Sequence, residues 1–150
     1  MTWAQAFSQL DSVRDELEMA RFALSLAQKA IHSGVRIDDR HLINPTNIRL
    51  CTANLEWTYS LRLFTDFEGV LRDYWGTAQR SPLPRRTRME VLINRVAARC
   101  SVPYDLLQDA HEVREQRNAI VHGSQGEQEI TFYECKTRLG KFLSYLPVRW

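Results

Sequence analysis

Apolar residues recur every three or four positions over the first thirty residues, and this spacing predicts an amphipathic helix. Thr2 and Gln5 have the spacing of a capping box, so the helix is expected to begin at Trp3. Gly34 is expected to end it. The apolar seam comprises Leu10, Val13, Leu17, Ala20, Leu24, Ala27 and Ile31. Such a seam is typical of a helix in an antiparallel bundle.

A long second helix is expected to follow. Asn44 and Pro45 combine a good N-cap with proline at the first helical position, and the helical pattern runs to about Trp75. One apolar stripe comprises Ile48, Cys51, Leu55, Tyr59, Leu63, Phe67, Val70 and Tyr74, and a second comprises Trp57, Leu61, Phe64, Leu71 and Trp75. Two apolar faces predict a central helix that is buried on both sides.

Three shorter helices are expected after a loop-like segment at 76–88. Thr87 and Glu90 have capping-box spacing, which predicts a helix that continues to Cys100. A fourth helix should end at His122, before Gly123, and a last one should begin between positions 124 and 131. The chain 1–150 is therefore expected to be a single all-α domain, a bundle of about five helices with a long central one.

Composition adds a few constraints. The chain is 44% hydrophobic and 25% charged, with a net charge of +2, which is ordinary for a globular protein. No signal-peptide pattern or membrane-length apolar run is seen, so we expect a cytoplasmic protein without a membrane partner. Cys51, Cys100 and Cys135 are widely spaced among apolar residues, which predicts buried, reduced thiols.

Arginine makes up 17 of the 20 basic residues. Its planar guanidinium can hold phosphate through two parallel hydrogen bonds, although a GC-rich genome would explain the same bias equally well. The densest basic patch is Arg85, Arg86 and Arg88, which either follows an RNA backbone or is simply a solvated loop.

Two charged residues interrupt the apolar stripes. Glu68 falls within the second stripe of the long helix. Arg117 falls within the apolar stripe of the fourth helix, which comprises Leu106, Ala110, Val113 and Ile120. A charge placed in the core is costly unless it is paired, so each needs a partner or both line a pocket. A direct Glu68–Arg117 bridge that only fixes helix register would explain both interruptions.

The neighbours of Arg117 favour chemistry over a simple bridge. At 100° per residue, Arg114, Arg117, Asn118 and His122 fall within an arc of about 140° on one helix face. Asn118 and His122 are spaced to hydrogen-bond, which would orient the imidazole.

These residues resemble the motif of the HEPN superfamily, whose nucleases carry arginine, four to six residues and then histidine near a helix end. Here the motif is Arg117-Asn118-Ala119-Ile120-Val121-His122. The long helix with Glu68 is similar to the acid-bearing helix of that family. The resemblance implies a homodimer through the motif helices, with a composite cleft for RNA and no metal or other cofactor. The chain also lacks the sequence motifs of metal sites.

The resemblance implies an endoribonuclease that acts as a toxin or phage-defence effector, with an antitoxin or sensor protein as a possible partner. His122 would be the general base on the ribose 2′-OH, leaving a 2′,3′-cyclic phosphate. Arg117, with Arg114, would hold the phosphate; Asn118 and Glu68 would orient these groups.

Some toxins of the family carry a tyrosine two residues after the histidine, where a partner modifies it, but this chain has Ser124 there.

Two other hypotheses compete with the ribonuclease. The family also contains catalytically silent modules that bind RNA or nucleotide, or serve in dimerisation. A helical structural subunit is the third possibility.

Overall fold

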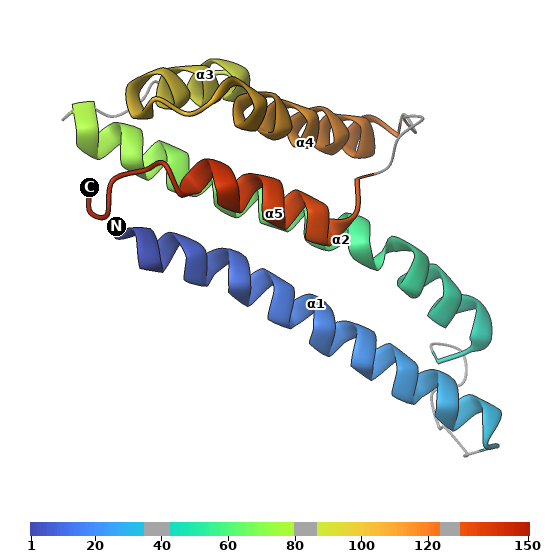
Figure 1. Cartoon of the computed structure of the whole chain (residues 1–150). Helices are drawn as coiled ribbons and strands as arrows, with labels where there is room; N and C mark the ends of the chain where they lie inside the picture. Colours follow the sequence, from blue (N-terminus) through green and yellow to red (C-terminus); the bar gives the residue numbers. More distant parts are fainter. Residues whose placement is uncertain (35–42, 80–86, 124–129) are drawn as a thin grey trace.

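The computed structural model describes residues 1–34, 43–79, 87–123 and 130–150 of the chain. Within these ranges it contains five α-helices and no β-strand, which confirms the all-α bundle expected from the sequence (Figure 1). The bounds are α1 Trp3–His32, α2 Pro45–Gln79, α3 Met89–Cys100, α4 Tyr104–His122 and α5 Phe132–Leu143.

The predicted starts of the first two helices are confirmed by their capping bonds, whereas α2 continues to Gln79, beyond its predicted end at about Trp75. At the start of α1, the Gln5 backbone N–H donates to the Thr2 hydroxyl at 3.2 Å and the Thr2 N–H donates to the Gln5 side chain at 2.8 Å. The Asn44 side chain accepts from the Asn47 N–H at 2.9 Å, directly before α2. Gly34, after α1, has a φ of 72°, a conformation that glycine adopts without strain.

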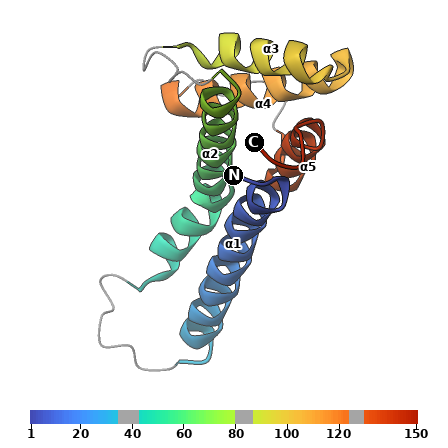
Figure 2. The same ribbon diagram turned by 90° about the vertical axis from the view of Figure 1, so that its left-hand side faces the viewer.

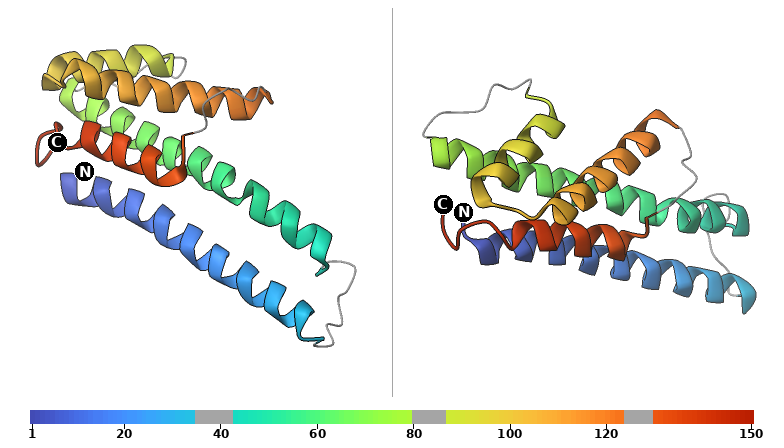
Figure 3. Two further views of the ribbon diagram at one scale, coloured as in Figure 1. Left: turned by 45° about the vertical axis from the view of Figure 1, so that its right-hand side comes forward. Right: turned by 45° about the horizontal axis from the view of Figure 1, so that its top comes forward.

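The helices form a stack in which α2 is central. In Figures 1, 2 and 3, α2 and α5 lie between α1 on one side and α3 with α4 on the other. Helix α2 packs against all four other helices, whereas α1 packs only against α2 and α5 within the described residues. This arrangement confirms the prediction of a long central helix, and it brings α2, α3 and α4 together on one side of the molecule.

The predicted stripes of α1 and α2 supply part of the core, and apolar residues of the shorter helices supply the rest. The Phe67 ring of α2 is fully buried and meets Phe142 of α5 edge-to-face, with ring centroids 5.5 Å apart. The largest fully buried side chains are Phe67, Phe132, Phe142, Leu10, Leu17, Leu63, Leu71, Leu92, Ile93, Leu139, Leu143 and Val13. Buried apolar residues of all five helices therefore meet in one core cluster.

The prediction that α2 is buried on both faces holds only for its second half. Near its start, Leu50 is 57% exposed and Cys51 is exposed, so the prediction of a buried Cys51 is wrong. The physical reason is length: α3, α4 and α5 are shorter and lie beside the C-terminal half of α2 (Figures 1 and 3). The second half of α1 and the first half of α2 form a two-helix arm.

Helix α3 begins differently from the prediction. Arg88, not Thr87, is its N-cap residue, and no side chain caps the helix there. The carbonyl of Thr87 instead accepts a hydrogen bond from Arg72 of α2 at 3.2 Å. The chain is thus tied to α2 two residues before the first residue of α3.

Candidate functional site

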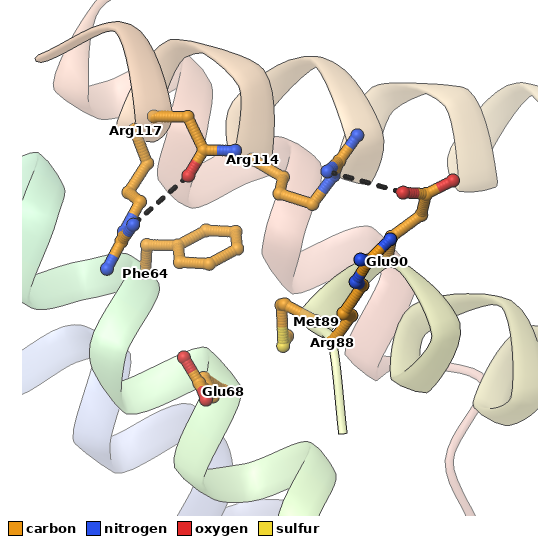
Figure 4. A pocket seen from close by; sticks show the side chains of 8 residues that line it. Phe64, Glu68, Arg88, Met89, Glu90, Arg114 and Arg117 are labelled. Atoms are coloured by element: carbon orange, nitrogen blue, oxygen red, sulfur yellow. Dashed lines mark hydrogen bonds and ion pairs between the residues drawn. The ribbon is translucent and has the colours of Figure 1, made fainter. Parts of the chain in front are cut away.

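A pocket of about 320 Å³ lies where α2, α3 and α4 meet (Figure 4). Three guanidinium groups and two carboxylates line it, above apolar side chains. The lining residues are Phe64 and Glu68 from α2, Arg88, Met89 and Glu90 at the start of α3, and Arg114, Arg117 and Asn118 from α4. The two residues that interrupt the apolar stripes, Glu68 and Arg117, therefore share one pocket, as one of the two sequence interpretations required.

Glu68 does not form the bridge to Arg117 that the sequence suggested. Its carboxylate accepts from Arg72, one helical turn later on α2, with Nε to Oε1 at 2.7 Å. The two side chains are 30% and 31% exposed, and Arg72 also reaches the Thr87 carbonyl. An arginine four residues away on the same helix needs no help from tertiary packing, and it takes the partner position. The arginine with which Glu68 pairs is therefore Arg72 and not Arg117.

Arg117 keeps its guanidinium within the pocket. Its Nη1 donates to the Asn118 side-chain oxygen at 3.0 Å, and its side chain forms no other hydrogen bond with the described residues (Figure 4). The Asn118 oxygen is thus occupied by Arg117, where the sequence suggested a bond to His122. Among the residues that the structure describes, Arg117 bonds only its neighbour on α4 and bridges no two helices.

Arg114 lies at the other end of the pocket, facing α3. Its side chain is 18% exposed and pairs with Glu90 at 3.8 Å, and with Glu115 at 3.3 Å. Its Nε–H is buried and has no acceptor in the described part of the chain. A buried donor without an acceptor is uncommon, because desolvation is then uncompensated.

His122 is the last residue of α4 and is exposed. Gly123 follows it with a φ of 68° and ends the helix as predicted. His122 does not line the pocket: it lies five residues beyond Arg117, or about 7.5 Å along the helix axis at 1.5 Å per residue. The structure therefore places Arg114, Arg117, Asn118 and Glu68 around one pocket and His122 beside it, at the open end of α4.

The basic patch expected at the start of the third helix is only partly described. Arg88 is exposed and contributes to the pocket from the N-cap of α3. Arg85 and Arg86 lie outside the described residues.

His111 is a feature that the sequence did not reveal. Its Nε2 lies 2.9 Å from the Asn94 side-chain oxygen on α3. Burial, and then the neighbouring Arg114 charge, lower the pKa of the His111 imidazole below its usual value. The contact joins two helices, and no spacing along the chain could have indicated it.

No family model matches the chain, and no curated protein or solved structure is significantly similar to it. Within the described ranges, no three His, Cys, Asp or Glu side chains gather closely enough to hold a metal ion. No helix in those ranges is long and apolar enough to cross a membrane.

Proposed function

We propose that the chain is a metal-independent endoribonuclease of the HEPN type, serving as a toxin or phage-defence effector. The observation that carries the proposal is that Arg117 is a half-buried arginine whose guanidinium faces a pocket and, within the described ranges, bridges no two helices. A purely structural arginine would be expected to bond across the helix interface. Arg117 instead remains available to an anionic ligand, one and a half turns from an exposed imidazole.

The proposed reaction is an internal transesterification of RNA. Neutral His122 takes the proton from a ribose 2′-OH, and the 2′ oxygen forms a bond to the adjacent phosphorus. The bond from phosphorus to the 5′ oxygen breaks, and that oxygen takes a proton from water. The products are a 2′,3′-cyclic phosphate and a 5′-OH end. Arg117 binds the phosphate and stabilises the charge that develops on its oxygens.

A homodimer through α4 is part of the proposal. His122 and Val121 are exposed at the end of α4, with Val121 52% exposed, so this end of the helix can accept a second copy. Two such ends, related by a twofold axis, would form a composite cleft for one RNA strand. An antitoxin or sensor protein would control the enzyme by covering that cleft.

A second candidate is a catalytically silent module that binds RNA or nucleotide. The position of His122 favours it, because the pocket itself is lined by guanidiniums and carboxylates and contains no imidazole. Such a module would need Arg117 but not His122.

The deciding experiment is cleavage of a labelled RNA by the purified chain in EDTA, with analysis of the product ends. We expect cyclic phosphate and 5′-OH ends, and a loss of about 10²- to 10⁴-fold in rate for His122→Ala. Arg117→Ala should also be inactive, whereas Arg49→Ala, an exposed arginine on the two-helix arm, should cleave normally. Activity that vanishes in EDTA and returns with Mg²⁺ would refute the mechanism. RNA binding that needs Arg117 without any cleavage would favour the silent module.

A further inference from the structure

The pocket has two ends with different partners. At the end nearer His122, Arg117 bonds to Asn118. At the opposite end, which we call the α3 end, lie Arg88, Glu90 and Arg114. Figure 4 shows that the Arg114 side chain extends toward Glu90 and away from Arg117.

The α3 end is too far from His122 to act on the same phosphate. Eight residues separate Arg114 from His122, which is about 12 Å along the axis of α4. Side chains on a helix all lean toward its N-terminus, so the leaning does not bring the two together. An anion bound at the α3 end is therefore not the scissile phosphate, which lies next to the 2′-OH that His122 deprotonates.

We propose that the α3 end binds the phosphate next to the scissile one, so that the preferred substrate is an RNA segment with two consecutive phosphates. This inference rests on the proposed function. The RNA backbone would run along α4, with the scissile phosphate near Arg117 and its neighbour between Arg114 and Arg88.

Two independent features of the α3 end suit a phosphate. Two guanidiniums converge on it from different helices, and each can donate two parallel hydrogen bonds to phosphate oxygens. The N-terminus of α3 has no side-chain cap, so its first N–H groups and its dipole favour an anion nearby.

Glu90 opposes the phosphate and so provides a test of opposite sign. Its carboxylate lies 3.8 Å from Arg114 and is 55% exposed, a loose pairing that leaves the side chain free to swing into solvent. A bound phosphate would take its place beside Arg114 but would still feel its charge. Glu90→Gln should therefore strengthen binding, whereas Arg88→Ala should weaken it.

The experiment compares short substrates that differ by one terminal phosphate. A dinucleoside monophosphate carries only the scissile phosphate; adding a 5′- or a 3′-terminal phosphate supplies the neighbour on one side or the other. For the wild type, one of the two additions should raise kcat/KM about tenfold or more, as expected for a charged hydrogen bond. In Arg88→Ala and in Arg114→Ala that gain should fall below about twofold, and in Arg49→Ala it should persist. No gain from either phosphate, or an equal gain in the Arg88→Ala variant, would overturn the proposal.

A binding experiment separates this inference from the proposed reaction. The 2′-O-methyl forms of the same dinucleotides cannot be cleaved by 2′-OH attack, so their affinities report recognition alone. The terminal phosphate should tighten binding in the wild type, more so in Glu90→Gln, and not in Arg88→Ala. If RNA is never cleaved but this pattern is found, the ribonuclease proposal fails and the phosphate site stands. If RNA is cleaved and the pattern is absent, the phosphate site is refuted alone.

Discussion

Replacing Arg117 with methionine tests whether the Arg117 guanidinium stabilises the fold or serves to bind a ligand. Methionine has a similar length and no charge, and it can pack against the buried Phe64 ring that forms part of the same pocket. The substitution removes one hydrogen bond, from Nη1 to the Asn118 oxygen at 3.0 Å. It leaves the Glu68–Arg72 pair intact, because that pair lies within α2.

The expected change in the free energy of unfolding is small. Loss of one partly exposed hydrogen bond from a charged donor costs about 1 kcal/mol. Methionine against Phe64 no longer carries a half-buried charge, and its added apolar burial offsets a cost of that size, at about 0.8 kcal/mol per buried methylene. We therefore expect a net change within about 1 kcal/mol of zero. If Arg117 were instead the buried partner of Glu68, its removal would cost about 3–5 kcal/mol.

Urea unfolding followed by circular dichroism at 222 nm measures this difference, with protomer concentration held fixed because a dimer would link stability to concentration. The double mutant Arg117→Met with Glu68→Gln should show a coupling energy near zero. The matched cycle between Glu68→Gln and Arg72→Met should show about 0.3–0.5 kcal/mol, as for other helical pairs at this spacing. Destabilisation of about 3 kcal/mol by Arg117→Met, or coupling above about 1 kcal/mol with Glu68, would refute our interpretation of Arg117.

Three further predictions concern the rest of the fold. A thiol reagent should label Cys51 rapidly in the native protein and Cys135 only after unfolding, because Cys51 is exposed while burial raises the pKa of Cys135 to about 11; equal rates would contradict the packing of α5. The pKa of His111 is lowered by burial, so the unfolded chain binds the extra proton more readily, and stability should fall as pH drops through about 6.5. His111→Gln should flatten that dependence in unfolding curves measured from pH 8 to pH 5, and an unchanged slope would count against it. Phe67→Ala should cost about 3–5 kcal/mol in urea unfolding, since the ring is fully buried against Phe142, and a cost below 1 kcal/mol would contradict this core.

The helices were predictable because their signals are local. The Thr2 capping box, the proline after Asn44 and the glycine after His122 each act through backbone groups a few residues away. The start of α3 was missed for the opposite reason: the Thr87 carbonyl bonds to Arg72 of α2, a tertiary contact that shifts the N-cap to Arg88.

Burial along α2 shows a second limit of the sequence. A helix with two apolar stripes can be covered on both sides only as far as its neighbours extend, and their lengths relative to α2 are a property of the whole bundle. Cys51 belongs to the first apolar stripe yet is exposed, on the two-helix arm near the start of α2. The stripe predicted which residues could be buried, not which of them are.

Only part of the candidate site could be predicted from the sequence. The two interrupted stripes left a shared pocket for Glu68 and Arg117 as one of two alternatives, and the structure bears it out. The Glu68–Arg72 pair has i,i+4 spacing but was not predicted, because the sequence suggested Arg117 as the partner of Glu68. The contributions of Arg88 and Glu90 could not be predicted, because they depend on how the start of α3 meets α4.

The position of His122 has a consequence for how a site could work. An imidazole inside the pocket would share it with three guanidiniums and could act there with them in a single chain. An imidazole at the exposed end of α4 instead meets only what approaches from outside the described chain, whether RNA or a second copy. Binding and proton transfer would then lie at different points along one helix, about one and a half turns apart. A ligand long enough to touch both points must extend along α4, and a polyanionic strand fits that requirement better than a compact metabolite confined to the pocket.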